Sequence, residues 1–161
     1  MKKRALNQTP TKEIKAIIFD VNGVLLKVHG RSIHEYMSKK LKVDMDDWFD
    51  TVEPFWEEMV KDESTTNYYL LEIAKHFNIP KYKLERFFKK AFRKHFKKDR
   101  QMFKLAKKLR EHYKTAVLSD QVKMSYEVFE RFNFDKLFDV VVWSQKEGIR
   151  KPNPEIYKLT A

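Results

Sequence analysis

Three short runs of β-branched and aromatic residues constrain the fold of this chain more than any other feature of its sequence. The runs are Ala16-Ile17-Ile18-Phe19, Thr115-Ala116-Val117-Leu118 and Val140-Val141-Val142-Trp143. Each run is apolar on both faces that its alternating side chains would form, which is typical of strands in a covered parallel sheet. Residues 126–132 lie between the last two runs and have apolar residues at helical spacing, so residues 115–143 predict a βαβ unit. The chain is therefore predicted to be an α/β protein with a Rossmann-like parallel sheet core, incomplete in that three strands are recognisable.

The long segment between the first and second runs has helical patterns and no comparable strand pattern. Its clearest helix has one face formed by Leu84, Phe87, Phe88, Ala91, Phe92, His95 and Phe96. The acids between Asp44 and Asp47 are of the kind that favours a helix N-terminus. We therefore predict an N-terminal tail at 1–14, a core formed by 15–31 and 101–161, and an inserted helical unit at 32–100.

Composition narrows the possible functions. A chain of 161 residues with 42% hydrophobic residues can bury the core of one ordinary domain. Its formal net charge of +11 favours an anionic partner, such as nucleic acid, an acidic membrane surface or a phosphorylated metabolite. The absence of cysteine excludes disulfides, thiolate metal sites and a cysteine nucleophile. No apolar run has the length of a membrane span or of a signal peptide's apolar region, so the sequence predicts a cytoplasmic protein without a membrane partner.

Polar residues follow the three predicted strands at or beyond their carboxyl ends. They are Asp20, Ser119 and, after a short connection, Lys151. Ligands of open α/β sheets bind outside the carboxyl ends of the strands, so we expect these side chains to converge. A carboxylate can attack phosphorus, a hydroxyl can donate to a phosphoryl oxygen, and an ammonium group can neutralise developing charge. The pattern predicts a phosphate site, where Gly23 allows close backbone approach or a positive φ in the turn after the first strand.

Three motifs resemble those of the haloacid dehalogenase-like hydrolase superfamily, most of whose members are magnesium-dependent phosphatases that work through an aspartyl-phosphate. The motifs are FDVNGVL at residues 19–25, VLSD at 117–120 and GIRKPNPEIY at 148–157. The helical insertion between the first two motifs resembles the small helical cap of this superfamily, which covers the site and helps to select substrates. WSQKEG at residues 143–148 is similar to a subgroup that includes sugar-phosphate phosphatases and the phosphatase domain of epoxide hydrolases.

The resemblance implies a role for each residue of the predicted site. Asp20 would be the catalytic nucleophile and a magnesium ligand, and Asn22 would offer its main-chain carbonyl oxygen to the same ion. Ser119 would bind the phosphoryl group of a small phosphorylated substrate, and Lys151 would stabilise the charge of that group. Mg²⁺ as cofactor would reduce the repulsion between the phosphate and the attacking carboxylate.

Two positions differ from the usual motifs of the superfamily. Asn22, which is among the predicted catalytic residues, stands where phosphatases usually have a second aspartate that protonates the leaving oxygen and then activates water. An amide cannot carry this proton, and loss of a general acid/base lowers the rate by roughly 10²- to 10⁴-fold. The resembled subgroup varies at this position. Asp120 stands where an amide is more usual, and it is a predicted substrate-binding residue together with Gly23 and Ser119.

The motif order also predicts that part of the core is missing. A helix is predicted to begin at Asn153-Pro154-Glu155, with asparagine as the N-cap and proline at the first helical position, shortly before the sequence ends at Ala161. The fourth motif of the superfamily, an acidic pair after a further strand beside the first, has no counterpart here. We therefore expect a truncated chain in which the strand at 16–19 is an exposed apolar edge.

Two other functions remain consistent with the sequence. One is a catalytically inactive member of the same superfamily that binds a partner or ligand. The other is a nucleic-acid-binding protein, because residues 81–100 contain ten Lys or Arg and two acidic residues. The regular apolar spacing leaves these charges on one exposed face, which is also the ordinary pattern of a solvated helix. The five histidines have no paired ligand spacing, so no histidine metal site is predicted.

Overall fold

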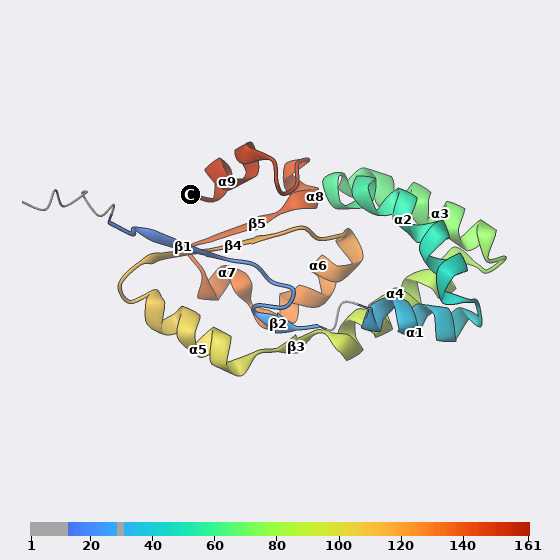
Figure 1. The fold of residues 1–161 in the computed structure, drawn as a ribbon, viewed down its shortest axis with the longest axis horizontal. Helices are drawn as coiled ribbons and strands as arrows, with labels where there is room; N and C mark the ends of the chain where they lie inside the picture. Colours follow the sequence, from blue (N-terminus) through green and yellow to red (C-terminus); the bar gives the residue numbers. More distant parts are fainter. Residues whose placement is uncertain (1–12, 29–30) are drawn as a thin grey trace, which may run out of the picture.

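The computed structural model describes residues 13–28 and 31–161. Residues 1–12 of the predicted tail therefore lie outside the described part. The elements, shown in Figure 1, are in chain order β1 (Ala16–Phe19), β2 (Leu26–Lys27), α1 (Ser32–Leu41), α2 (Met45–Lys61), η1 (Glu63–Thr65), α3 (Thr66–His76), α4 (Lys81–His95), β3 (Lys97–Lys98), α5 (Arg100–Leu109), β4 (Lys114–Ser119), α6 (Lys123–Phe129), η2 (Glu130–Phe132), α7 (Phe134–Leu137), β5 (Val140–Trp143), α8 (Ser144–Glu147) and α9 (Pro154–Thr160). Within the described ranges, no helix combines the length and apolar character that crossing a membrane requires.

β1, β4 and β5 form a parallel sheet in the order β1-β4-β5. Phe19 pairs with Val117, and Ser119 at the end of β4 pairs with Trp143. The three strands lie where the sequence predicts them, and β4 is longer by one residue at each end. β4 is central and is buried from Thr115 onward, because its side chains are covered on both faces. The predicted α/β fold with a parallel sheet is confirmed.

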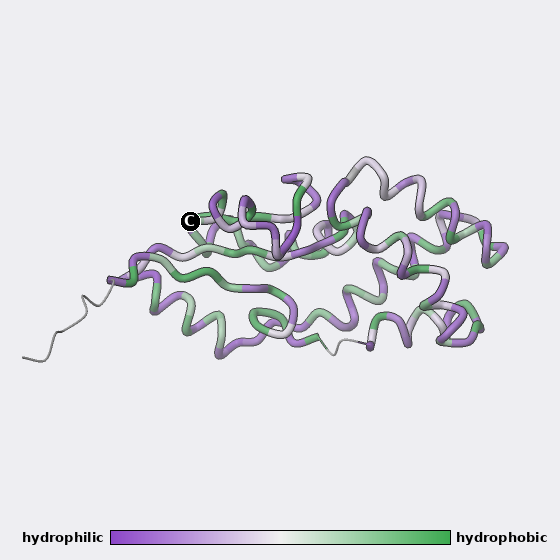
Figure 2. The backbone as a smooth tube through the Cα atoms, turned by 45° about the horizontal axis from the view of Figure 1, so that its top comes forward, coloured by the Kyte–Doolittle hydropathy of each residue, from purple (hydrophilic) through white to green (hydrophobic). Residues whose placement is uncertain are grey.

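Apolar side chains cover the two faces of the sheet. On one face, the rings of Phe19 and Phe138 pack edge to face at 5.7 Å within the main hydrophobic core, which continues into the helices of the insertion. On the other face, Ile156 of α9 packs with Leu118 and Val142 in a smaller cluster. Figure 2 shows largely hydrophobic strands, whereas α5 alternates between hydrophobic and hydrophilic residues. This difference reflects strands that are covered on both faces and helices that bury one side.

β1 lies at an edge of the sheet. It pairs with β4 on one side, and no strand among residues 13–28 and 31–161 pairs with its other side. Ala16 is exposed, and 39% of Ile18 is exposed. The exposed apolar edge that the sequence predicts is therefore present in the described part of the chain.

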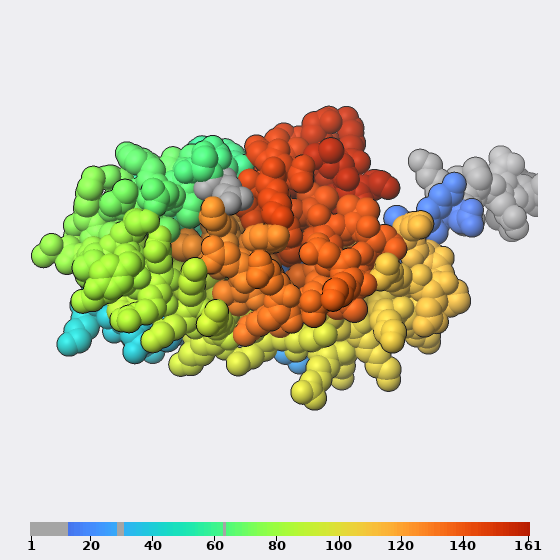
Figure 3. Space-filling model, turned by 180° about the vertical axis from the view of Figure 1, so that it is seen from behind, coloured from blue at the N-terminus to red at the C-terminus, as the bar shows by residue number. Residues whose placement is uncertain are grey.

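The helices α1 to α4 gather at one end of the molecule, beyond the carboxyl ends of the strands (Figure 1). Trp48 of α2 is fully buried among them, with its ring 5.7 Å from that of Phe77 and 5.8 Å from that of Phe88. Figure 3, seen from behind, shows the segment between β4 and β5 packed between this helical part and α5. The insertion thus has an aromatic core that is continuous with the core beneath the sheet.

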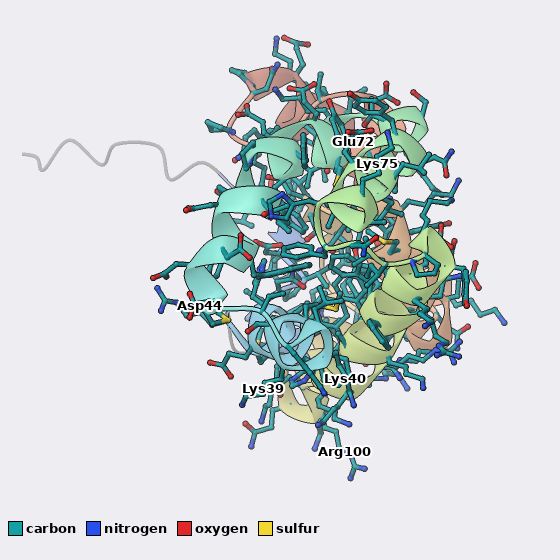
Figure 4. All side chains as sticks on the ribbon, turned by 90° about the vertical axis from the view of Figure 1, so that its right-hand side faces the viewer. Lys39, Lys40, Asp44, Glu72, Lys75 and Arg100 are labelled. Atoms are coloured by element: carbon teal, nitrogen blue, oxygen red, sulfur yellow. The ribbon has the colours of Figure 1, made fainter. Side chains whose placement is uncertain are left out.

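α4 has the amphipathic pattern that the sequence predicts. It buries Leu84, Phe88, Ala91 and Phe92. It exposes Lys83, Arg86, Lys90 and Arg93. Figure 4 shows that Lys39 and Lys40 of α1 and Arg100 of α5 point outward on the same side, away from the paired Glu72 and Lys75. The exposed basic residues of α4 form a solvated helix face, and nucleic-acid binding stays a prediction.

A two-stranded antiparallel ribbon joins the two ends of the helical insertion. Leu26 of β2 pairs with Lys98 of β3, and Lys27 pairs with Lys97. β2 leads into α1 and β3 follows α4, so the segments that enter and leave the insertion run side by side (Figure 1). This ribbon could not be predicted from the sequence, because strands of two residues leave no periodic pattern. The division into a core and a cap at residues 32 and 100 stays a prediction.

Candidate active site

Parallel pairing brings Asp20 and Ser119 to the same edge of the sheet. Asp20 directly follows β1, and Ser119 is the last residue of β4. The Ser119 hydroxyl donates a hydrogen bond of 2.9 Å to Oδ1 of Asp20. Lys151, from the segment between α8 and α9, donates a bond of 2.9 Å from Nζ to Oδ2 of the same carboxylate. The structure thus brings three of the predicted site residues together, although 99 and 131 positions separate Asp20 from the other two.

The three side chains differ in their access to solvent. The side chain of Asp20 is 41% exposed and that of Lys151 is 24% exposed, whereas Ser119 is buried. The backbone N–H of Val21 also donates to Oδ1 of Asp20, over 2.6 Å. A molecule from solvent can therefore reach the Asp20 carboxylate. Hydrogen bonds from Val21, Ser119 and Lys151 fix the position of this carboxylate.

Asp120 contacts the backbone of the lysine rather than the carboxylate of Asp20. Its Oδ1 accepts a bond of 3.1 Å from the backbone N–H of Lys151, and its Oδ2 lies 3.8 Å from Nε of Arg150. Arg150 in turn donates to the backbone carbonyl oxygen of Lys151 over 3.2 Å. These contacts fix the backbone that presents Lys151, and a direct role of Asp120 in substrate binding stays a prediction.

Asn22 and Gly23 form the turn after β1. Gly23 has a φ of +77°, and its backbone N–H donates to the carbonyl oxygen of Leu26 over 2.9 Å. A Cβ at Gly23 would meet no atom within 4 Å, so the positive φ, and not a close approach within the protein, accounts for glycine here. Asn22 is exposed, and within the described part of the chain no hydrogen bond joins its side chain to Asp20, Ser119 or Lys151.

A buried polar group behind Ser119 was not identified from the sequence. Nε2 of Gln121 donates to the Ser119 hydroxyl over 2.8 Å, and Gln121 is only 2% exposed. Its place three residues beyond a predicted strand end is the one sequence signal, because an isolated glutamine belongs to no motif. The site therefore has a polar layer behind the residues that face solvent.

The helical insertion approaches the site through α2. Oε1 of Glu57 lies 3.7 Å from Nη1 of Arg150. The hydrogen bond from Lys61, followed by the charges of Lys61 and Arg150, lowers the pKa of Glu57 below its usual value. A cavity of about 430 Å³ lies here between α2 and residues 148–153. Its charged groups suit an anionic or hydroxyl-bearing molecule beside Lys151.

The Asp20 carboxylate, 41% exposed, is a donor that this site offers to a hard cation, and the resemblance would add the main-chain carbonyl oxygen of Asn22. In the ranges that the structure describes, no three Asp, Glu, His or Cys side chains cluster as a ready-made metal cage. Mg²⁺ is often held by one or two carboxylates, with substrate phosphate and water as its other ligands. The donor chemistry at Asp20 therefore fits a magnesium ion that is shared with a bound phosphate.

Comparison with protein families agrees with these motifs. The model of haloacid dehalogenase-like hydrolases matches residues 14–161, nearly the whole chain. The chain belongs to the haloacid dehalogenase-like (HAD-like) hydrolase family. No curated protein matches it.

Solved structures share this fold with the present HAD-like hydrolase. A HAD family enzyme from Bacteroides thetaiotaomicron is 18% identical, with a TM-score of 0.75 over 92% of this chain and 77% of that one. The wild-type form of that enzyme in complex with magnesium and inorganic phosphate has a TM-score of 0.69 at 18% identity, over 91% and 77% of the two chains. A predicted HAD-like family hydrolase from Porphyromonas gingivalis is 19% identical, with a TM-score of 0.75 over 91% and 74%. Identities this low establish a common fold.

Proposed function

We propose that this HAD-like hydrolase is a magnesium-dependent phosphatase that cleaves a small phosphate monoester through an aspartyl-phosphate on Asp20. One observation carries the proposal. The Ser119 hydroxyl lies 2.9 Å from Oδ1 of the accessible Asp20 carboxylate, and the Lys151 ammonium group lies 2.9 Å from its Oδ2. The complex of the Bacteroides thetaiotaomicron enzyme with magnesium and inorganic phosphate supports the same class of ligand here.

The reaction has two steps at phosphorus. An oxygen of Asp20 attacks phosphorus while the bond from phosphorus to the leaving oxygen breaks, and the leaving oxygen takes a proton from solvent. Water then attacks the aspartyl-phosphate and releases inorganic phosphate, the Asp20 carboxylate and a proton. Ser119 donates to a phosphoryl oxygen and Lys151 neutralises the charge that develops there. Bound Mg²⁺, held by Asp20 and a carbonyl oxygen of Asn22, would reduce the repulsion between carboxylate and phosphate.

The cavity between α2 and residues 148–153 is the proposed place of the leaving group. Lys61 and Arg150 offer hydrogen-bond donors there, and Glu57 offers an acceptor. A small metabolite with hydroxyl or anionic groups beside its phosphate would use both kinds of partner. This is the basis for proposing a phosphorylated metabolite rather than an apolar ester.

Phosphate release from p-nitrophenyl phosphate, with and without Mg²⁺, tests the proposal. Asp20→Asn keeps the shape of the side chain but removes the nucleophile, and we expect it to abolish release. Asp135→Asn makes the same change at an exposed site on α7 and serves as the matched control. Equal rates for Asp20→Asn and the parent would overturn the mechanism.

A phosphate-binding protein without turnover is the second candidate. It is favoured by the amide at Asn22 and by the absence, in the described part of the chain, of three Asp, Glu, His or Cys side chains clustered to hold a metal. Calorimetric titration with inorganic phosphate and Mg²⁺ distinguishes the two functions. Binding without release of phosphate from any of a panel of phosphate esters would favour this second candidate.

A further inference from the structure

A chain of hydrogen bonds runs from the Asp20 carboxylate into the interior of the core. Oγ of Ser119 lies 2.9 Å from Oδ1 of Asp20, and Nε2 of Gln121 lies 2.8 Å from the same Oγ. Oγ of Ser125 lies 2.8 Å from Oε1 of Gln121. Ser119, Gln121 and Ser125 are all buried. These three side chains therefore satisfy one another without solvent.

Counting protons fixes the direction of each bond. The Asp20 carboxylate faces the Lys151 ammonium group and acts as an acceptor, so the single hydroxyl proton of Ser119 points toward it. The Ser119 oxygen must then accept from Gln121, which turns Nε2 toward Ser119 and Oε1 toward the Ser125 hydroxyl. The single proton of Ser125 is shared between Oε1 of Gln121 and the carbonyl oxygen of Val122, each 2.8 Å from its Oγ. One orientation of the Gln121 amide satisfies the whole chain.

Gln121 is held in this orientation at both its backbone and its side chain. Its backbone N–H donates to Oγ of Ser144 over 3.0 Å, at the junction of β5 and α8. Its side chain makes the two bonds to Ser119 and Ser125. Turning the amide away would leave buried polar groups without partners, which is costly. Nε2 of Gln121 is therefore a donor of fixed position, and its hydrogen bond fixes the position of the Ser119 oxygen.

We propose that Gln121 is a positioning residue of the phosphoryl-transfer site, a role that rests on the proposed phosphatase function. By donating to Ser119, Gln121 fixes the hydroxyl oxygen and directs its proton outward, toward Asp20 or a ligand. When a phosphoryl group occupies the site, the Ser119 hydroxyl donates to a phosphoryl oxygen instead of to Asp20. An oxygen of Asp20 then loses a donor and its lone pair becomes available for attack on phosphorus. Gln121 itself does not touch the substrate.

The first test replaces Gln121 and compares it with a second buried glutamine. Gln121→Met removes both the donor and the acceptor of the side-chain amide at similar volume. Gln145→Met is the matched control, because Gln145 is 4% exposed and neither of its amide atoms has a hydrogen-bond partner in the described part of the chain. We expect Gln121→Met to lower kcat for p-nitrophenyl phosphate about tenfold, and to weaken inorganic phosphate binding by calorimetry, whereas Gln145→Met changes neither. An unchanged kcat and phosphate affinity in folded Gln121→Met would overturn the proposal.

A double-mutant cycle with Ser119→Ala separates positioning from a general effect on the fold. If Gln121 acts through Ser119, Gln121→Met has no further effect on kcat once Ser119 is alanine. A full tenfold loss in both backgrounds would show that Gln121 acts elsewhere and would overturn the proposal. Gln121→Leu is a second variant if Gln121→Met does not fold. It also offers no donor to Ser119, so the same loss is expected.

The outcomes separate this proposal from the one on which it rests. If the parent protein neither releases nor binds phosphate, the phosphatase function fails and the positioning role fails with it. If the parent and Gln145→Met are active and Asp20→Asn is not, the phosphatase function stands. An active Gln121→Met that matches the parent then removes only the positioning role.

Discussion

The Lys151 ammonium group lies 2.9 Å from Oδ2 of Asp20, although 131 residues separate the two in the chain. Both side chains are partly exposed, so water screens their attraction and the pair contributes little to the stability of the fold. Asp120 nevertheless holds the backbone N–H of Lys151 over 3.1 Å. A contact that stabilises little but is positioned in this way agrees with the chemistry proposed at Asp20.

We predict that Lys151→Met lowers kcat by about 10²- to 10³-fold, because the charge that develops on the phosphoryl oxygens loses its cation. The free energy of unfolding should change by less than about 1 kcal/mol, since the pair with Asp20 is partly exposed. Steady-state kinetics and urea unfolding measure the two quantities. Lys158→Met on α9 is the matched control and should keep the parent rate. A large loss of stability with little loss of kcat would show that Lys151 is structural.

We predict that Asn22→Asp raises kcat, by up to about 10²-fold, because a carboxyl group can protonate the leaving oxygen and then activate water. The structure leaves room for this change, since Asn22 is exposed and makes no hydrogen bond to the three converging side chains. The pH dependence of kcat should gain a new ionisation at the same time. Asn78→Asp, at an exposed turn before α4, controls for added charge. An unchanged rate and pH profile would mean that residue 22 does not reach the leaving group.

The fold could be predicted from the sequence where patterns are local. The runs at 16–19, 115–118 and 140–143 are strands because β-branched residues apolar on both faces suit a covered parallel sheet. Two helix starts follow from local chemistry as well. Asp44 accepts from the backbone N–H of Asp46, and Asn153 accepts from that of Glu155.

The site could be predicted only for residues that the motifs and the strand ends mark. Asp20, Ser119 and Lys151 converge as expected, because β1 and β4 end at the same edge of the sheet and the segment after α8 brings Lys151 to that edge. Gln121 could not be identified, since its partners Ser119 and Ser125 become informative only when their side chains are placed in three dimensions. Asp120 contacts Lys151 and not Asp20, because successive side chains at a strand end point in opposite directions.

We predict that the stability of the fold decreases as pH falls below about 6.5, through His34. Burial lowers the pKa of His34, and Nδ1 of its ring accepts a bond of 3.0 Å from Nε1 of Trp48, which requires the neutral ring. Well above pH 6.5, the ordinary pKa of histidine, His34 is neutral in both the folded and unfolded states. Below it, the unfolded state gains a proton that the folded state resists, so the free energy of unfolding falls until pH passes the lowered pKa.

Urea unfolding of His34→Gln at pH 7.5 and 5.5 checks this prediction. Glutamine can accept from Trp48 but does not titrate, so the variant should lose less stability at the lower pH than the parent. Burial also lowers the pKa of His95, so part of the pH dependence should remain. His112→Gln replaces an exposed histidine and should behave as the parent does. The same loss of stability in His34→Gln and the parent would exclude His34 as a source.

We predict that Gly23→Ala lowers the free energy of unfolding by about 1 kcal/mol, because φ is +77° and a side chain with Cβ is strained there. The added Cβ meets no atom within 4 Å, so no steric term adds to this strain. Gly23→Asn should cost less, because asparagine tolerates the left-handed region better than alanine. Gly148→Ala, at a φ of +72° after α8 and also without close neighbours, should cost a similar amount. If Gly23→Ala instead abolished phosphate release at unchanged stability, close approach of a ligand to the turn, and not its φ, would explain the glycine.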